Sequence, residues 1–458
     1  MEIIEFDSEL IRKYDIAGPR YTSYPTAPQF SEEFDEGILL EIIDKTNREM
    51  IPSSLSLYVH IPFCDTICYY CACNKIITKD HSRVGPYLLL LKQEMEMISQ
   101  RFDPDRSVSQ IHLGGGTPTF FDDNQLQQLM DMIEDIFTVS PDCEKSIELD
   151  PRKISDESIV LLTRLGFNRI SLGVQDFDLQ VQKAVNRVQS FQLVKDRLNA
   201  ARFHGIKSIN MDLIYGLPLQ TVESFHQTLE KVIELKPDRL SVFNYAHLPE
   251  RFKPQRRINP DDLPSPEQKL DILNLCIRML QQAGYVYIGM DHFALEGDSM
   301  LTAQHEGTLQ RNFQGYSTHA QSDLVGIGVS AISNICDSYS QNPTTMEAYQ
   351  AAIQQNRLPV FRGMTMSLDD RIRQAVISQL ICHFKLDIAQ FEKQWKLSFK
   401  KYFSAEVEAL VNFEADGLLR VSEAEIKISQ QGRLLVRNIC MVFDAYIGKK
   451  NIQYSRAI

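Results

Sequence analysis

Apolar runs of strand length alternate with amphipathic stretches of helical spacing through the middle of this chain. Phe225, Leu229 and Val232 recur at helical spacing in one such stretch, and Pro237 then ends it. Alternation of strands and helices is typical of a parallel sheet covered by helices. The pattern predicts an α/β fold, a partial or complete (β/α) barrel. The expected strands lie at 56–62, 110–115, 145–150, 169–174, 208–216 and 239–247.

The two ends of the chain have a different pattern. The first fifty residues are polar and rich in turn signals, as in GPRYTSYPTAPQF, whereas from about Met364 the spacing is mainly helical around one polar hairpin near 417–428. We therefore predict an N-terminal extension or flap at 1–50, a barrel domain at 51–363 and a helical domain at 364–458.

Composition and charge narrow the function classes. Hydrophobic residues make up 43% and charged residues 24%, which is the balance of a folded protein. The net charge of −12 disfavours non-specific binding to nucleic acid. The acidic N-terminus is unlike a signal peptide, and no apolar run reaches the roughly 18 residues of a membrane-spanning helix. We expect a cytoplasmic protein without a membrane partner.

Four of the nine cysteines fall in one short window, at Cys64, Cys68, Cys71 and Cys73. Three thiolates on a short loop can hold three irons of a cubane cluster and leave the fourth iron open to an exchangeable ligand. Structural zinc is the alternative, with His60 or Cys73 completing a set of four ligands. The spacing alone leaves both interpretations open.

Polar and glycine residues end the strands that follow. Gly114-Gly115-Gly116-Thr117-Pro118 ends the second predicted strand, and Glu148, Gln175 and Asp212 lie on later ones. A single residue of this kind is more often a cap or a structural carboxylate. Because the carboxyl ends of barrel strands converge on one rim, several together predict a ligand cavity there.

These motifs in combination closely resemble the oxygen-independent coproporphyrinogen III oxidase family of the radical S-adenosylmethionine (SAM) superfamily. The related heme chaperone-like branch, which binds and transfers heme, is the alternative. It typically lacks RYTSYP and a cysteine at the position of Cys73. Ala72 departs from the glycine that relatives often carry. The matching segments are PRYTSYPT (19–26), YVHIPFC (58–64), CACNK (71–75), GGGTPT (114–119), ELDPR (148–152), SLGVQDF (171–177), NMDLIYGLP (210–218), SVFNYAHLP (241–249), GMDHFA (289–294), RNFQGY (311–316) and GVSAIS (328–333).

The resemblance implies a set of cofactor-binding residues. Cys64, Cys68 and Cys71 would ligate a [4Fe-4S] cluster, with SAM chelating the open iron. Contacts to this SAM map onto Tyr58, Tyr70, Gly115, Gly116, Thr117, Glu148, Gln175, Arg187 and Asp212. A second SAM is implied at Ala246, Gln314 and Ile332. Cys73 and Tyr58 are the candidates for a catalytic role.

The implied reaction is anaerobic oxidative decarboxylation in heme biosynthesis. A 5′-deoxyadenosyl radical made from SAM removes a hydrogen from the β-carbon of a propionate, which then loses an electron and carbon dioxide. Two propionates of coproporphyrinogen III become the vinyl groups of protoporphyrinogen IX. A reductant of flavodoxin or ferredoxin type and a monomeric enzyme are the further expectations.

The substrate is a tetracarboxylate and the chain is acidic, so cations must gather where the substrate binds. The candidates are Arg20, Arg311 and the basic run at 251–257, for which a solvated loop is an equally good interpretation. Arg20, Tyr21 and Tyr24 suit a flap that closes over the barrel mouth.

Overall fold

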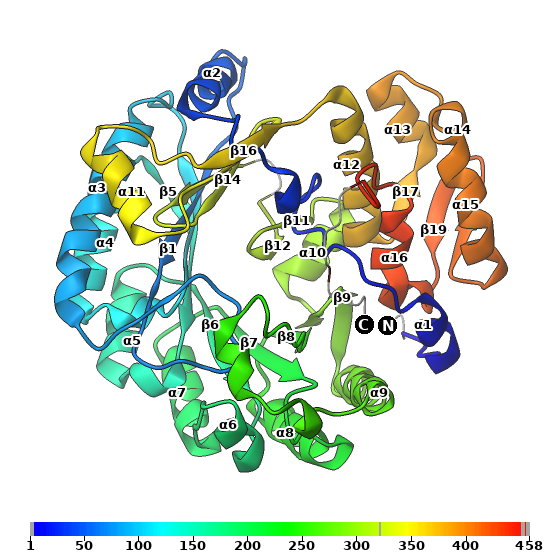
Figure 1. Cartoon of the computed structure of the whole chain (residues 1–458), viewed down its shortest axis with the longest axis horizontal. Helices are drawn as coiled ribbons and strands as arrows, with labels where there is room; N and C mark the ends of the chain where they lie inside the picture. The colour runs from blue at the N-terminus through cyan, green and yellow to red at the C-terminus, as the bar shows by residue number, and fades with distance from the viewer. Residues whose placement is uncertain (1–3, 320–321, 450–453, 455–458) are drawn as a thin grey trace. The chain divides into compact units, whose positions relative to one another are not determined.

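The computed structural model describes residues 4–319, 322–449 and 454, and they form two compact units (Figure 1). Unit 1 comprises Met1–Gln29, Ser265–Ala320 and Met366–Ile458, and unit 2 comprises Phe30–Pro264 and Gln321–Thr365. Within the described ranges no helix has both the length and the apolar character needed to cross a membrane. The three consecutive domains expected from the sequence stay a prediction.

Unit 2 is built on one mainly parallel sheet, as the strand–helix alternation predicts. Its strand order is β16-β15-β14-β13-β1-β4-β5-β6-β7-β8. The neighbours from β13 to β8 pair in parallel, and β14, β15 and β16 add antiparallel pairs. The strands are β1 (Leu55–Ile61), β4 (Val108–Gly115), β5 (Val139–Leu149), β6 (Arg169–Gln175), β7 (Ser208–Tyr215), β8 (Arg239–Asn244), β13 (Asp323–Ile327), β14 (Ile332–Ile335), β15 (Ser338–Gln341) and β16 (Arg362–Thr365).

Helices cover the outer side of these strands, and Figure 1 shows α3, α4, α5, α7 and α8 along it. Asp122 and Thr221 begin two of them with capping boxes, which satisfy backbone N–H groups that the helix leaves free. The helices are α2 (Glu36–Asn47), α3 (Val84–Ser99), α4 (Asp123–Ile136), α5 (Asp156–Arg164), α6 (Leu179–Ala184), α7 (Phe191–Phe203), α8 (Val222–Leu235) and α11 (Met346–Gln354).

Burial alternates along the central strands and sorts their side chains onto two faces. In β6 and β7 every second residue is buried, and the half-buried positions between them include Ser171, Gln175, Asn210 and Asp212. Successive side chains of a strand point to opposite faces, so the polar residues line the face away from the apolar core. The fold thereby gathers on one face the polar residues expected at the strand ends.

Unit 1 is mainly helical. Its small sheet, in the order β17-β19-β18, contains the hairpin expected near 417–428. The elements are α1 (Ser8–Tyr14), α9 (Pro266–Gln282), β9 (Tyr285–Gly289), β10 (His292–Leu295), α10 (Ser299–Glu306), β11 (Gln310–Asn312), β12 (Gly315–Ser317), α12 (Leu368–His383), β17 (Lys385–Asp387), α13 (Ile388–Trp395), α14 (Phe399–Tyr402), α15 (Ser404–Ala415), β18 (Leu419–Val421), β19 (Glu425–Ile428) and α16 (Val436–Met441).

The N-terminal segment is packed into unit 1 instead of extending from it. Tyr21 and Tyr24 are 3% and 2% exposed, and the Tyr21 hydroxyl donates to Asp444 at 3.0 Å. The buried guanidinium of Arg437 donates to the carbonyl of Pro19 at 2.7 Å. Such burial holds the segment against the C-terminal helices. Whether it closes on a substrate stays a prediction.

Candidate active site

The cysteine loop follows β1 and is closed at its base by a short parallel pair. β2 (Phe63–Cys64) pairs with β3 (Ile76–Ile77), so residues 65–75 form a loop between them. The Gly116 N–H donates to the carbonyl of Ile61 at 2.8 Å, and that of Thr117 donates to the carbonyl of Phe63 at 2.9 Å. No residue from 65 to 74 is buried. The glycine turn after β4 therefore supports a loop that lies at the protein surface.

Each of the three predicted cluster thiols lies against a polar or cationic group. The Cys64 Sγ is 3.3 Å from the Thr117 Oγ1, and the Arg187 Nη1 donates to the Cys68 Sγ at 3.6 Å. Burial raises the pKa of Cys64 to about 11, and the negative charges of Cys71 and Cys68 contribute to that rise. The three thiols thus lie close enough for each charge to act on the next.

Cys71 and Cys73 form a second pair of thiols. A hydrogen bond between them, and then the Lys75 ammonium, hold the pKa of Cys71 below its usual range. Lys75 also donates to the carbonyls of Cys71 and Cys73, at 3.0 and 3.1 Å. Cys71 is half-buried and Cys73 is exposed. The loop therefore favours a thiolate at Cys71, the protonation state that a cluster ligand needs.

These residues fit an iron–sulfur cluster chemically. The thiols of Cys64, Cys68 and Cys71 meet two cations, Arg187 and Lys75, which compensate the negative charge of a thiolate-bound cluster. In the described residues no three His, Cys, Asp or Glu side chains are arranged around a single metal ion. A cubane differs from such a site because each thiolate binds a different iron.

The glycines after β4 are required by close packing. Gly115 has φ +113°, and a Cβ there would lie 2.5 Å from the His60 ring. A Cβ on Gly116 would lie 2.7 Å from the backbone of Pro62. Both distances are shorter than Cβ contacts allow, so a side chain at Gly115 would displace the His60 ring, and one at Gly116 would displace the backbone that leads into the cysteine loop. The Gly115 N–H donates to the Glu148 carboxylate at 3.1 Å.

Glu148 and Asp212 face the interior with opposite pKa shifts. Burial by itself would raise the pKa of Glu148. The hydrogen bonds from His112 and the Gly115 N–H outweigh burial and hold that pKa below its ordinary value. Burial and then the charge of Glu148 raise the pKa of Asp212 to about 6, although Ser171 and Asn210 donate to it at 3.0 and 2.8 Å. The two carboxylates repel each other when both are ionised, so a cationic ligand bound between them would reduce that repulsion.

His112 is a site residue that sequence reasoning missed. Its Nδ1 lies 2.6 Å from the Ser146 hydroxyl and its Nε2 lies 3.4 Å from Glu148. Its ring stacks on Tyr58 at 5.8 Å, and the Tyr58 hydroxyl is 3.1 Å from His60 Nδ1. His112 stands two residues before Gly114, on the same strand face. The period of two along a strand could therefore have indicated from the sequence that His112 faces the site.

Arg187 links the cysteine loop to the ends of β5 and β6. It is 7% exposed, and it donates to the carbonyl of Gly173 and pairs with Asp150 at 3.3 Å. Burial alone would lower its pKa, but the charges of Tyr70, Asp150 and Cys68 raise it. Gln175 ends β6 with φ +69°. Arg187 is therefore a fixed cation beside Cys68.

The residues implied for a second SAM are divided between the units. Ala246 follows β8, and its carbonyl accepts from Gln255 at 3.2 Å. Ile332 begins β14, and both residues belong to unit 2, whereas Gln314 lies between β11 and β12 in unit 1. Of the first predicted set, Tyr58, Gly115, Glu148, Gln175 and Asp212 lie on strands of one sheet, whereas Gly116, Thr117, Tyr70 and Arg187 lie on the loops that follow β4, β2 and α6. The second set stays a prediction.

Comparison with known proteins identifies the family. Residues 58–232 match the family model of the radical SAM superfamily, and residues 366–435 match that of the HemN C-terminal domain. The oxygen-independent coproporphyrinogen III oxidase of Pseudomonas aeruginosa is 52% identical, with 100% of each chain covered. That of Escherichia coli is 50% identical over 99% of each chain.

The chain belongs to the oxygen-independent coproporphyrinogen III oxidase family.

A solved structure agrees with this membership. Coproporphyrinogen III oxidase (HemN) from Escherichia coli, described as a radical SAM enzyme, superposes with a TM-score of 0.93 at 48% identity, covering 97% of this chain and 100% of that one. The predicted α/β radical SAM fold is confirmed, as is a [4Fe-4S] cluster with SAM as the cofactors. The heme chaperone-like alternative is not favoured. The roles of the individual residues stay predictions.

Proposed function

We propose that this chain is an oxygen-independent coproporphyrinogen III oxidase, a radical SAM oxidoreductase of heme biosynthesis. It converts two propionate side chains of coproporphyrinogen III to vinyl groups. Each propionate passes one hydrogen atom to the 5′-deoxyadenosyl radical and one electron to a one-electron acceptor, carbon dioxide leaves, and the product is protoporphyrinogen IX. The observation that carries the proposal is the cysteine loop, whose thiols contact Thr117 and Arg187 at the same strand ends that hold Glu148.

The side chains around the loop have distinct tasks. When bound, the cluster and SAM supply reductive cleavage of SAM to methionine and a 5′-deoxyadenosyl radical. Cys64, Cys68 and Cys71 hold the cluster. Glu148 and Asp212 bind cationic or hydroxyl groups of SAM, because their mutual repulsion falls when a cation lies between them. Arg187 pairs with the SAM carboxylate.

Tyr58 stays a neutral phenol. Burial, and then the charge of Glu148, raise its pKa well above the usual value. Its hydroxyl lies 3.1 Å from His60, and its ring stacks on His112. A neutral hydroxyl held in this way donates a hydrogen bond without adding charge to the site. It positions SAM beside the carboxylate pair.

A cluster of arginines in unit 1 provides the cations that a tetracarboxylate needs. Arg20 pairs with Asp291 at 3.4 Å, and Arg311 donates to the carbonyl of Arg20, also at 3.4 Å. Burial, and then the charges of Arg20 and Arg311, lower the pKa of Arg437 to about 10. Arg311 Nη1 is buried and makes no hydrogen bond among the described residues. This Arg311 donor suits a propionate carboxylate.

The remaining parts of the proposal concern the reductant, the oligomeric state, the cellular location and the second SAM. The electron that cleaves SAM comes from a reductant of flavodoxin or ferredoxin type. The enzyme works as a monomer in the cytoplasm. Ala246, Gln314 and Ile332 contact a second SAM.

Anaerobic turnover tests the proposal. The brown holoenzyme, given coproporphyrinogen III, SAM and dithionite, is expected to form protoporphyrinogen IX, methionine and 5′-deoxyadenosine. Cys68→Ser is the control: it should lose the [4Fe-4S] absorbance, the iron and all turnover, yet give a soluble apoprotein. Tight heme binding without decarboxylation would instead favour a heme carrier. Normal iron and normal product in Cys68→Ser would contradict the assignment of the loop.

A further inference from the structure

Two exposed basic segments flank the cysteine loop. One is the end of α6, where Lys183 is exposed. The other surrounds a short 3₁₀ helix, Lys253–Arg257, which follows β8. We call these cations the basic platform: they are all exposed, and they are Lys183, Arg251, Lys253, Arg256 and Arg257.

Both segments are attached to the backbone of the cysteine loop. On one side the Tyr69 N–H donates to the carbonyl of Val185 at 3.0 Å, and Asn186 donates to the carbonyl of Ile67 at 2.7 Å. On the other side Gln255, which is 1% exposed, donates to the carbonyl of Tyr70 at 3.1 Å. The Arg257 guanidinium lies 5.3 Å from the centre of the Tyr69 ring. The two segments that carry the cations are therefore anchored to the loop, and Arg257 lies directly beside it.

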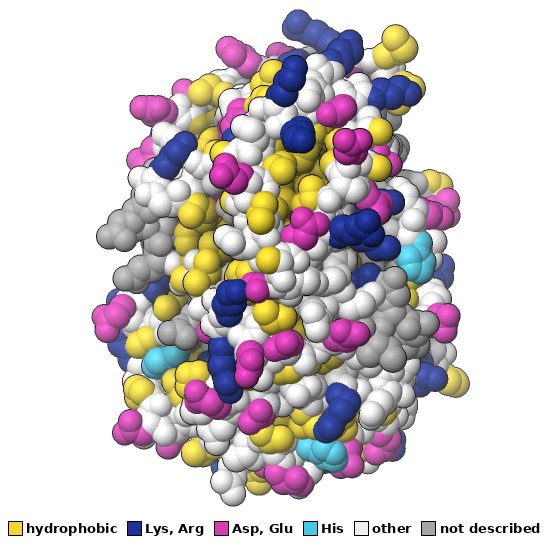
Figure 2. Space-filling view, turned by 90° about the vertical axis from the view of Figure 1, so that its right-hand side faces the viewer, with side chains coloured by type: hydrophobic (Ala, Val, Ile, Leu, Met, Phe, Trp, Pro, Cys, Tyr) yellow, Lys and Arg dark blue, Asp and Glu magenta, His cyan; other side chains and the backbone are white. Residues whose placement is uncertain are grey.

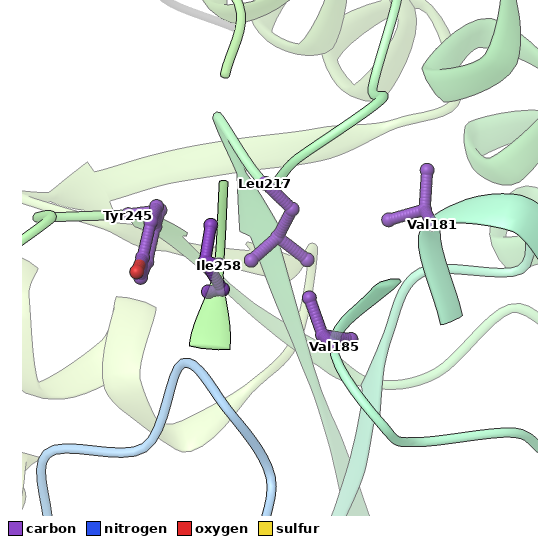
Figure 3. Packing of buried hydrophobic residues seen from close by; sticks show 5 residues of the cluster. All are labelled: Val181, Val185, Leu217, Tyr245 and Ile258. Atoms are coloured by element: carbon purple, nitrogen blue, oxygen red, sulfur yellow. The ribbon is translucent and has the colours of Figure 1, made fainter. Parts of the chain in front are cut away.

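An apolar cluster beneath the loop makes this arrangement rigid. Figure 3 shows its five side chains pointing toward one another, from α6 and from the loops that follow β7 and β8. Tyr69 and Tyr70 of the cysteine loop pack against the same cluster. The loop and both basic segments thus share one support. The cluster consists of Val181, Val185, Leu217, Tyr245 and Ile258.

The platform cations make no ion pairs within the described part of the chain. Arg256 donates to the carbonyl of Pro249 at 3.0 Å, and Arg251 lies over the Phe252 ring. The acidic residues nearest in sequence are exposed as well, namely Glu250, Asp261 and Asp262. On the face shown in Figure 2, by contrast, basic and acidic side chains are interspersed. Unpaired cations fixed around one loop are unusual in a chain of net charge −12.

We infer that the basic platform is the docking surface of a small acidic electron-transfer protein. The inference rests on the proposed function, which consumes one electron per SAM cleaved. That electron enters the C5′–S bond, which breaks to leave methionine and the radical, and the docked protein is oxidised by one electron. Complementary charge speeds such transient encounters and orients them. The platform surrounds the loop that holds the cluster, so docking there brings the donor to the electron acceptor.

This assignment separates the basic run at 251–257 from substrate binding. The platform side chains are exposed, whereas Arg311 of unit 1 has a buried donor atom that lacks a hydrogen-bond partner among the described residues. A carboxylate bound in a closed site needs buried donors. A protein partner needs exposed ones that stay hydrated until contact.

Charge reversal with two electron sources tests the inference. Lys183→Glu/Lys253→Glu changes two exposed platform lysines whose side chains make no hydrogen bond or ion pair within the described ranges. Lys207→Glu/Lys393→Glu is the matched control, since both lysines are exposed and lie outside the basic platform, Lys207 between α7 and β7 and Lys393 on α13. Turnover of each holoenzyme is measured with dithionite and with a purified reduced bacterial flavodoxin. Flavodoxin binding is measured separately by calorimetry at low and high salt, and thermal midpoints check folding.

We expect the platform variant to raise the KM and Kd for flavodoxin roughly tenfold or more at low salt, with dithionite turnover unchanged. The control should match the wild type, and added salt should narrow the difference. Equal flavodoxin binding in the two variants would overturn the inference. So would a fall in dithionite turnover confined to the platform variant. Loss of turnover in the wild type with both reductants would instead contradict the proposed function, and the binding data would still decide this inference.

Discussion

At the residue scale, Cys73 is the thiol that a three-ligand cluster leaves over. It is exposed and shares a hydrogen bond with Cys71. A thiolate at Cys73 would compete with SAM for the fourth iron. Cys73→Ser is therefore expected to keep its iron and its SAM-dependent change in the electron paramagnetic resonance spectrum, yet to lose turnover by about tenfold or more. Loss of iron would make Cys73 a ligand, and unchanged turnover would leave it a packing residue.

A substitution of Arg311 tests the proposed binding of the substrate carboxylates, also at the residue scale. Its Nη1 is buried and lacks a hydrogen-bond partner in the described structure, and a charge-assisted hydrogen bond contributes about 1.5–3 kcal/mol. Arg311→Ala should therefore raise the KM for coproporphyrinogen III by roughly tenfold or more, with the KM for SAM unchanged. Arg420→Ala, an exposed arginine of the same unit, is the control. An unaltered substrate KM would remove Arg311 from the site.

At the scale of elements, the buried carboxylate of Glu94 connects α3 to three other parts of unit 2. It accepts from the Gly328 N–H after β13 at 2.7 Å and from Asn342 after β15 at 2.6 Å, and the Tyr349 hydroxyl of α11 donates to it as well. Glu94 is 3% exposed, and burial raises its pKa to about 7 despite these three donors.

The sign of the resulting pH dependence follows from the raised pKa. The unfolded carboxyl ionises near pH ~4.3, so the folded state holds its proton to higher pH than the unfolded state. The contribution of Glu94 to the free energy of unfolding is therefore largest below about pH 4.3. It falls by about 3 kcal/mol as the pH rises to about 7. Urea unfolding should give a lower free energy of unfolding at pH 8 than at pH 5 in the wild type and in Glu96→Gln. The same difference between the two pH values in Glu94→Gln would contradict the assignment.

The N-terminal segment is a second element whose role can be measured. Deleting residues 1–26 removes the buried Tyr21 and Tyr24 and leaves Arg437 without the Pro19 carbonyl. We expect a lower thermal midpoint, with a loss of about 3 kcal/mol or more, and SAM cleavage uncoupled from decarboxylation. The cluster should still assemble, since its ligands belong to unit 2. Tyr24→Ala should reproduce part of the destabilisation, and Ile16→Ala, at a position 51% exposed, should not.

At the scale of the whole molecule, we expect the folded core of unit 2 to be independent of the cluster. The sheet of unit 2 is buried along β1, where Leu57, Val59 and Ile61 are fully enclosed. Of the three predicted cluster ligands, Cys64 is buried at the end of β2, and Cys68 and Cys71 lie half-buried on the loop that follows it. Exposure to oxygen or a chelator should therefore bleach the brown absorbance and abolish turnover while far-UV circular dichroism stays unchanged. Global unfolding on bleaching would show that the cluster holds the fold together.

Much of the fold and part of the site follow from local pattern. The strand at 56–62 and the helix after Thr221 were predictable because burial repeats with the period of each element, and a capping residue marks where the helix begins. The cysteine spacing and the glycines after β4 are local too, since each acts within a few residues of its neighbours.

The tertiary structure decided everything that joins distant parts of the chain. His112 meets Glu148 across two strands, Arg187 reaches Cys68 from 119 positions away, and the basic run reaches the cysteine loop through Gln255. The N-terminal segment, predicted as an extension or flap, makes hydrogen bonds to residues more than 400 positions later, a contact that no local pattern indicates. Local periodicity determines which face of an element is apolar. It does not determine which distant face covers it, because that choice depends on long-range packing and on the hydrogen bonds that buried polar groups must find.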